Sequence, residues 1–96
     1  MKVKNIIGSS RFKKPKGYDS WLDYWEQQTG INPTFCSEKD CIRRDLVGAH
    51  VKDAFGFDKH WYIVPLCKGC NQRTDMFEVP VHLLVPVPSN LLTEDD

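Results

Sequence analysis

Four cysteines, arranged in two pairs, constrain the fold of this 96-residue chain more than any other feature. Four residues separate Cys36 from Cys41, and two residues separate Cys67 from Cys70. Such pairs are typical of a site in which two tight turns bring four thiolates onto one tetrahedral zinc ion. The sequence therefore predicts that Cys36, Cys41, Cys67 and Cys70 bind a structural zinc ion.

Two disulfide bonds are the alternative use of four cysteines, and disulfides persist in oxidising compartments. Residues 1–10 contain no long apolar stretch of the kind that opens a secretory signal. We therefore expect a cytoplasmic protein that holds zinc. A chain of this length builds only a marginal apolar core, so a structural metal would contribute needed stability. The apolar run at 81–86 is too short to cross a bilayer, and no membrane partner is expected.

Charge is distributed unevenly although the formal net charge is zero. Six of the thirteen Lys and Arg residues precede the first acidic residue, Asp19, while three acidic residues close the chain. This pattern predicts a basic arm over 1–17, a zinc-stabilised domain over 18–88 with its core at 36–77, and an acidic tail over 89–96. Lys13, Lys14 and Lys16 of the arm would contact phosphates, or the arm would simply be solvated.

Helical spacing of aromatic residues follows Ser20, whose pairing with Asp23 resembles a capping box, and Gly30 ends the pattern. Apolar runs at 46–51 and 61–66 predict two strands of a hairpin. A second helix is expected from 68 to about 77, and the proline-rich segment 79–88 is expected to be an extended edge segment or a wrap around the domain. Knuckle, hairpin and helix together predict a small α+β treble-clef zinc finger with an added N-terminal helix.

Two stretches of this pattern resemble the HNH endonuclease family. They are Gly48-Ala-His-Val51 and Tyr62-Ile-Val-Pro-Leu-Cys-Lys-Gly-Cys-Asn71, and the resemblance covers about 36–77. It implies that the four-cysteine zinc is structural and that His50 activates water as a general base. It also implies that Asn71 faces a second divalent cation such as Mg²⁺. A histidine suits the role of general base because its ordinary pKa of about 6.5 lies near working pH.

Two positions depart from the family pattern. Ala49 stands where active members carry a metal-binding Asp, and Tyr62 stands where they carry a central Asn. A methyl group cannot bind a hard cation, so these departures favour a degenerate catalytic centre. Asp53 or Asp75 would have to supply the missing carboxylate in an active enzyme. His50 also has structural alternatives, as a hydrogen-bonding residue of the hairpin or as a zinc ligand in place of one cysteine.

Cationic residues within or beside the motif are the remaining candidates for nucleic-acid contact: Arg43, Arg44, Lys52, Lys68 and Arg73. They would position duplex DNA through its phosphates with little sequence preference, or they would only keep the surface soluble. No small-molecule cofactor is expected.

Three functional hypotheses follow. The first is a nucleic-acid-binding protein with a degenerate centre, and the second is an active metal-dependent endonuclease. The third is a protein-interaction adaptor that presents Trp21, Trp25 and Trp61 together with the proline-rich segment as a partner surface.

Overall fold

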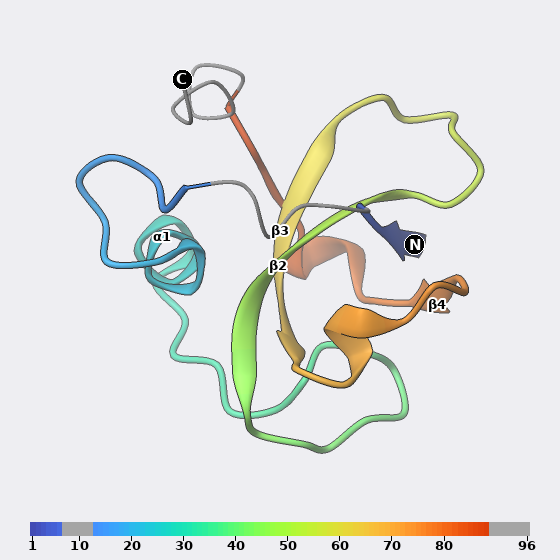
Figure 1. The fold of residues 1–96 in the computed structure, drawn as a ribbon, viewed down its shortest axis with the longest axis horizontal. Helices are drawn as coiled ribbons and strands as arrows, with labels where there is room; N and C mark the ends of the chain where they lie inside the picture. Colours follow the sequence, from blue (N-terminus) through green and yellow to red (C-terminus); the bar gives the residue numbers. More distant parts are fainter. Residues whose placement is uncertain (7–12, 89–96) are drawn as a thin grey trace.

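The structure is a computed structural model that describes residues 1–6 and 13–88. Over these residues it contains one α-helix, a five-stranded sheet and two short 3₁₀ turns (Figure 1). In chain order the elements are β1 (Lys2–Asn5), α1 (Trp21–Thr29), β2 (Leu46–Asp53), β3 (Trp61–Cys67), η2 (Cys70–Gln72), β4 (Phe77–Glu78), η3 (Val81–Leu83) and β5 (Val85–Pro86).

The antiparallel hairpin of β2 and β3 forms the centre of the sheet, whose strand order is β4-β1-β2-β3-β5. Its pairing runs from Leu46 opposite Cys67 at one end to Lys52 opposite Trp61 at the other. We call the first the metal end and the second the loop end. The two predicted strands and their hairpin are confirmed.

Helix α1 begins and ends where the local sequence predicts. The Ser20 Oγ accepts the backbone N–H of Asp23 at 2.9 Å, which caps the first turn. Gly30 adopts a left-handed conformation with φ of 71° and closes the last turn by donating its N–H to the Glu26 carbonyl. The predicted N-terminal helix is confirmed.

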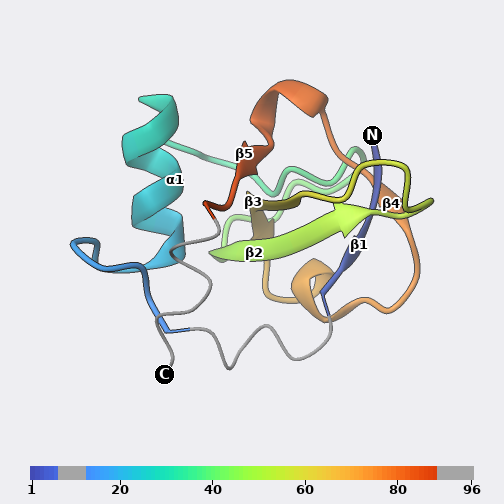
Figure 2. The ribbon, with the colours of Figure 1, turned by 90° about the horizontal axis from the view of Figure 1, so that it is seen from above.

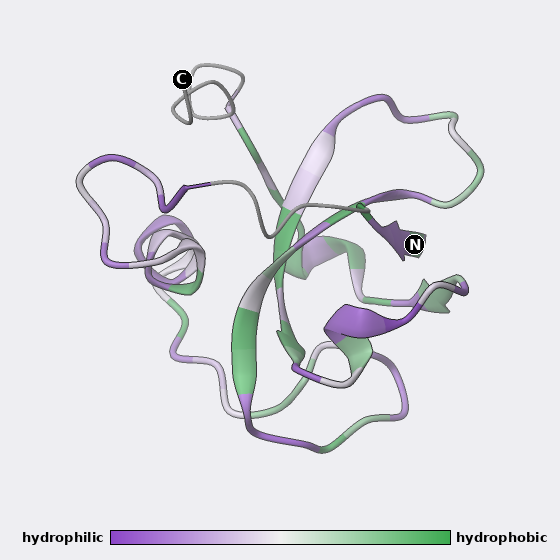
Figure 3. Cartoon of the chain, in the orientation of Figure 1, coloured by the Kyte–Doolittle hydropathy of each residue, from purple (hydrophilic) through white to green (hydrophobic). Residues whose placement is uncertain are grey.

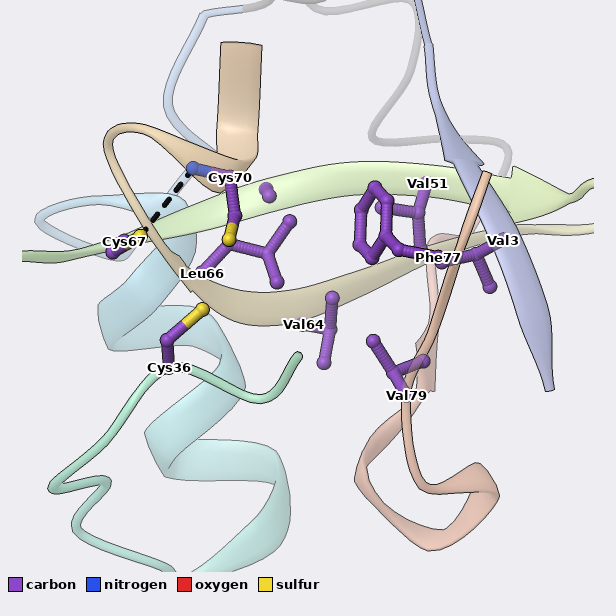
Figure 4. Close-up of a cluster of buried hydrophobic side chains, with 10 residues drawn as sticks. Val3, Cys36, Val51, Val64, Leu66, Cys67, Cys70, Phe77 and Val79 are labelled. Carbon is purple, nitrogen blue, oxygen red and sulfur yellow. Dashed lines mark hydrogen bonds between the residues drawn. The ribbon is translucent and has the colours of Figure 1, made fainter. Parts of the chain in front are cut away.

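The two faces of the sheet have different coverings, because side chains alternate along each strand. On one face α1 packs through Trp21, Tyr24 and Trp25 against Ile63 and Val87 (Figure 2). The opposite face carries a larger apolar cluster that includes Val3, Val51, Val64, Leu66, Phe77, Val79 and three of the cysteines (Figure 4). We call these the helix face and the metal face.

Close approach of α1 to β2 requires a glycine at position 48. A Cβ at Gly48 would lie 2.4 Å from the Leu22 backbone nitrogen and 2.5 Å from the Trp21 carbonyl carbon. Backbone atoms cannot move aside as a flexible side chain can. The missing side chain of Gly48 therefore sets how closely the helix lies on the sheet.

The helix expected over residues 68 to about 77 is wrong. The chain forms only the 3₁₀ turn η2 and then extends into β4, which pairs with β1. The Asn5 side-chain amide donates to the carbonyls of Cys70 and Arg73, both at 2.9 Å, which holds this turn against β1. Gly69, Asn71 and Thr74 also favour helix weakly, so the strand pairing prevails. The helix of a treble clef is thus replaced here, while the small α+β class holds.

The N-terminal residues differ from expectation as well. Lys2–Asn5, assigned from the sequence to the basic arm, form a strand between β2 and β4. Residues 7–12 of the arm and 89–96, the expected acidic tail, lie outside the described residues. The proline-rich segment agrees with the prediction in part: β5 pairs with β3 at the edge of the sheet, whereas Val81–Leu83 forms the 3₁₀ turn η3.

Candidate metal centre

The four cysteines converge at the metal end of the hairpin. Their sulfur atoms all lie within 4.8 Å of one another, and the Sγ atoms of Cys41 and Cys67 are 3.8 Å apart. A tetrahedral ion with metal–sulfur bonds of about 2.3 Å separates its sulfurs by about 3.8 Å. All four cysteines are free thiols, so the alternative of two disulfides is not what the structure shows. The cluster fits one metal ion.

Backbone hydrogen bonds shape the first cysteine pair into a knuckle. The Cys36 N–H donates to the Arg43 carbonyl at 2.8 Å, and the Cys41 N–H donates to the Glu38 carbonyl at 3.0 Å. The adjacent Ser37 N–H donates to the carbonyl of Pro65 in β3 at 2.9 Å. These bonds attach the knuckle to the hairpin and aim two sulfurs at the end of β3.

The second pair lies where β3 passes into η2. The Cys70 N–H donates to the Cys67 Sγ at 3.3 Å, as the dashed line in Figure 4 shows. The preceding Lys68 N–H donates to the Asp45 carbonyl at 3.2 Å, which joins this turn to the end of the knuckle. An N–H donor favours a sulfur that carries negative charge, so the turn suits a thiolate ligand.

Burial and hydrogen bonding make the four thiols unequal. Burial raises the pKa of Cys36 and of Cys70 above that of a free cysteine. Burial acts in the same direction on Cys67, but hydrogen bonds from the Cys70 N–H and the neighbouring thiols outweigh it, so its pKa is lowered. A bound divalent cation would favour the thiolate form of all four, because only the thiolate binds a metal.

His50 lies on the helix face, away from the cysteine cluster. Its ring packs edge-on against Trp21 with 4.8 Å between ring centroids, and its side chain is 4% exposed. Burial lowers the pKa of His50 to about 4, so the ring is neutral near pH 7. His50 is not one of the clustered metal ligands, and the predicted alternative that it replaces a cysteine is not supported.

The other residues proposed for a second metal site are held elsewhere. Asn71 lies in η2, whose neighbours Cys70 and Arg73 contact Asn5 on the metal face. The two candidate carboxylates have local partners: Asp53 accepts the N–H groups of Phe55 and Asp58, and Asp75 binds the guanidinium of Arg73. Within residues 1–6 and 13–88, the four cysteines are the only group of three or more Cys, His, Asp or Glu residues arranged to hold a metal.

The two departures from the family motif have structural roles. Ala49 is 1% exposed in the apolar cluster of the metal face, where a carboxylate would be buried. The Tyr62 hydroxyl donates to Asp58 in the β2–β3 loop, which raises the pKa of Tyr62 to about 12 and lowers that of Asp58 to about 2. Both residues stabilise the hairpin.

The cationic residues singled out in the sequence lie on several separate segments of the chain. Three are exposed on the segment that leads into α1: Lys13, Lys14 and Lys16. Three are exposed around the cysteines: Arg43, Arg44 and Lys68. Arg43 lies 3.3 Å from Asp45, and the Arg44 guanidinium lies 5.8 Å from the centre of the Phe35 ring.

Arg73 and Lys52 complete the predicted set and are in different surroundings. Arg73 is engaged within the fold, since it binds Asp75 at 2.6 Å and lies over the Phe77 ring at 4.9 Å. Lys52 is at the loop end, where it shares a pocket with Lys4 and Lys59. Sequence reasoning missed these two lysines as partners of Lys52. The proximity of Lys4 depends on the pairing of β1 with β2, and that of Lys59 on the path of the β2–β3 loop.

Two of the three tryptophans expected on an adaptor surface belong to the core. Trp21 is 7% exposed and Trp25 is 1% exposed, and the Trp25 indole N–H donates to the Leu83 carbonyl at 2.7 Å. The partner surface predicted from Trp21 and Trp25 is therefore wrong. Their role is to pack α1 on the sheet.

Comparisons with other proteins leave the family open. No known family, curated protein or solved structure matches the chain. Among the described residues, no helix has the length and apolar character needed to span a membrane.

Proposed function

We propose that this protein is a zinc-stabilised, HNH-like domain that binds nucleic acid and has a degenerate catalytic centre. The observation that carries the proposal is the cluster of four free cysteines with sulfurs within 4.8 Å. Soft thiolate ligands in a tetrahedral set select zinc over magnesium or calcium. Four thiolates leave no open position for substrate, so this zinc is structural.

Three observations support a degenerate catalytic centre. His50 is buried against Trp21, whereas a general base must reach the water that it activates. Asp53 and Asp75 are engaged by local partners, so neither replaces the carboxylate missing at Ala49. No second group of three or more Cys, His, Asp or Glu residues arranged to hold a metal accompanies the cysteines in the described part of the chain.

Exposed cations support a nucleic-acid partner. Arg43, Arg44 and Lys68 surround the metal site, and Lys13, Lys14 and Lys16 precede α1. Such side chains would contact the phosphates of duplex DNA and give binding that depends on salt rather than on sequence. The cytoplasm, where thiols stay reduced, is the compartment that suits this site.

The test measures binding and cleavage on the same zinc-loaded protein. We expect the protein to bind a blunt DNA duplex with an affinity that falls steeply as the salt concentration rises. The triple variant R43Q/R44Q/K68Q should bind the duplex more weakly. Exchange of Lys39, which is also exposed on the knuckle, for Gln is the matched control. Absence of duplex and single-strand binding at low salt would overturn the proposal.

Cleavage is tested with supercoiled plasmid and added Mg²⁺, Mn²⁺ or Ni²⁺. We expect no nicking above the level given by His50→Gln, whose zinc content should equal that of the unaltered protein. Nicking that this substitution abolishes would show an active endonuclease and refute the degenerate centre.

A further inference from the structure

A pocket of about 440 Å³ lies at the loop end of the hairpin, at the opposite end of β2 and β3 from the cysteines. Lys4, Lys52, Lys59, Phe55 and Trp61 contribute to its lining. In Figure 1 the β2–β3 loop extends away from the body of the sheet on the side opposite the knuckle. The pocket is therefore separate from the metal centre and from the cations around it.

Strand register places the side chains of Lys4, Lys52 and Trp61 in a row. Lys4 of β1 is opposite Lys52 of β2, and Lys52 is opposite Trp61 of β3. Residues paired directly across neighbouring strands point to the same face, which here is the helix face, as alternation from His50 shows. Lys59 joins the row from the loop. Three ammonium groups are thereby brought to one concave surface.

The three lysines outnumber the two carboxylates among the side chains that line the pocket. Neither Lys4, Lys52 nor Lys59 forms an ion pair within the described residues. Two carboxylates also line the pocket, those of Asp53 and Asp58.

All four oxygens of these two carboxylates are engaged within the loop. Those of Asp53 accept backbone N–H groups from Phe55 and Asp58. Those of Asp58 accept the Tyr62 hydroxyl and the N–H of His60. These carboxylates keep their negative charge, but their oxygens already accept hydrogen bonds from the protein, whereas the three ammonium groups belong to exposed side chains. An anionic ligand would therefore bind at the ammonium groups.

Phe55 lines the pocket with the lysines, and the ring of Phe57 lies beside that of Phe55, outside the lining residues. Phe55 is 58% exposed and Phe57 is 88% exposed, and their ring centroids are 6.5 Å apart with 36° between the ring planes. Figure 3 shows hydrophobic positions at the tip of this loop between hydrophilic stretches. Large apolar side chains this exposed contribute little to the core. Rings beside cations are the combination that binds unpaired nucleotides, because phosphates meet the charges and bases stack on the rings.

We infer that the loop-end pocket binds single-stranded nucleic acid, with Lys4, Lys52 and Lys59 on its phosphates and Phe55 and Phe57 against its bases. This inference rests on the proposed nucleic-acid binding and adds a second, distinct contact surface to it. Duplex DNA would contact the cations around the cysteines, whereas an unpaired strand would occupy the pocket.

The experiment compares two DNA probes by fluorescence anisotropy, an oligothymidine of about 20 nucleotides and a blunt duplex of the same length. The test variants are K4Q/K52Q/K59Q and Phe57→Ala, both at exposed positions. The matched controls are R43Q/R44Q/K68Q for the charges and Phe35→Ala, an exposed ring on the knuckle, for the aromatic change. Zinc content and circular dichroism verify that each variant is folded.

We expect the variant K4Q/K52Q/K59Q to bind the single strand about tenfold or more weakly. The slope of its log binding constant against log salt concentration should fall in magnitude by about two. Phe57→Ala should lower the affinity for the single strand by roughly fivefold or more, while the affinity for the duplex stays unchanged. Phe35→Ala should leave single-strand binding unchanged.

Other outcomes separate this inference from the proposed function. Duplex binding without single-strand binding would overturn the pocket assignment and leave the proposed function standing. The pocket assignment would also be overturned if K4Q/K52Q/K59Q lost affinity equally for both probes and Phe57→Ala had no effect. That result would show a surface that binds phosphates in general. Absence of binding to either probe would overturn the proposed function and the inference together.

Discussion

Among single residues, the cysteines have the sharpest consequences because each supplies one of four sulfurs and the described residues offer no fifth donor in the group. We predict that Cys36→Ser lowers zinc content well below one ion per chain. The free energy of unfolding should fall by several kcal/mol, because metal binding and folding are coupled. Zinc titration and urea unfolding measure both quantities. Lys39→Ala on the same knuckle is the control, and retention of full zinc and stability by Cys36→Ser would contradict the metal site.

Another residue-scale consequence concerns the buried His50. Its pKa is about 4 in the folded protein and about 6.5 in the unfolded chain. As pH falls below 6.5, His50 therefore binds a proton in the unfolded chain but stays neutral in the folded protein. The free energy of unfolding falls as a result, down to about pH 4. Through His50 alone, the free energy of unfolding should fall by about 2 kcal/mol between about pH 7 and pH 5.

Urea unfolding of zinc-loaded protein and of His50→Gln across this pH range measures the effect. The cysteines titrate in both proteins, so the difference between the two isolates His50. We expect the stability of the unaltered protein to fall more steeply than that of the variant. Parallel curves would show that His50 is not buried as a neutral ring.

At the scale of elements, the contact between α1 and β2 depends on Gly48. We predict that Gly48→Ala destabilises the protein by about 1–3 kcal/mol, since the added Cβ would overlap the backbone of Trp21 and Leu22. Gly69→Ala is the matched control, because its Cβ would meet nothing closer than the Cys67 sulfur at 4.0 Å. Equal unfolding midpoints for the two variants would contradict this account of helix packing.

Elements with local signals were predictable from the sequence, and those made by distant pairing were not. The cap of Ser20 and the turn at Gly30 lie within a few residues of α1, and the apolar runs of β2 and β3 are adjacent in sequence. In contrast, β4 exists because β1 pairs with it from about 75 residues away. That pairing also replaced the expected helix after Cys70.

The same distinction applies to the candidate sites. The spacing of two cysteine pairs was sufficient to predict which four residues form a cluster that could hold a metal, because each pair is a local turn. The loop-end pocket needs Lys4 opposite Lys52, a contact that follows only when β1 enters the sheet. His50 was placed on a strand correctly, but its burial under Trp21 depends on how α1 docks.

For the whole molecule, the important feature is that two apolar clusters share one thin sheet. The metal face includes three cysteines in its core, while the helix face buries Trp21 and Trp25 without any cysteine. Both clusters draw on β3, through Val64 and Leu66 on one face and Ile63 on the other. The packing of the tryptophans should therefore depend, through the hairpin, on an ordered metal end.

We predict that zinc removal unfolds both faces together, because a chain this small has little apolar core to spare and its central strands end at the metal site. A chelator should abolish the near-ultraviolet circular dichroism of the buried tryptophans in step with the appearance of four reactive thiols. Added zinc should restore the signal, which controls for irreversible damage. If the tryptophan signal instead survives when all four thiols react, α1 and its face of the sheet are stable without the metal, and the ion orders only the knuckle and the η2 turn.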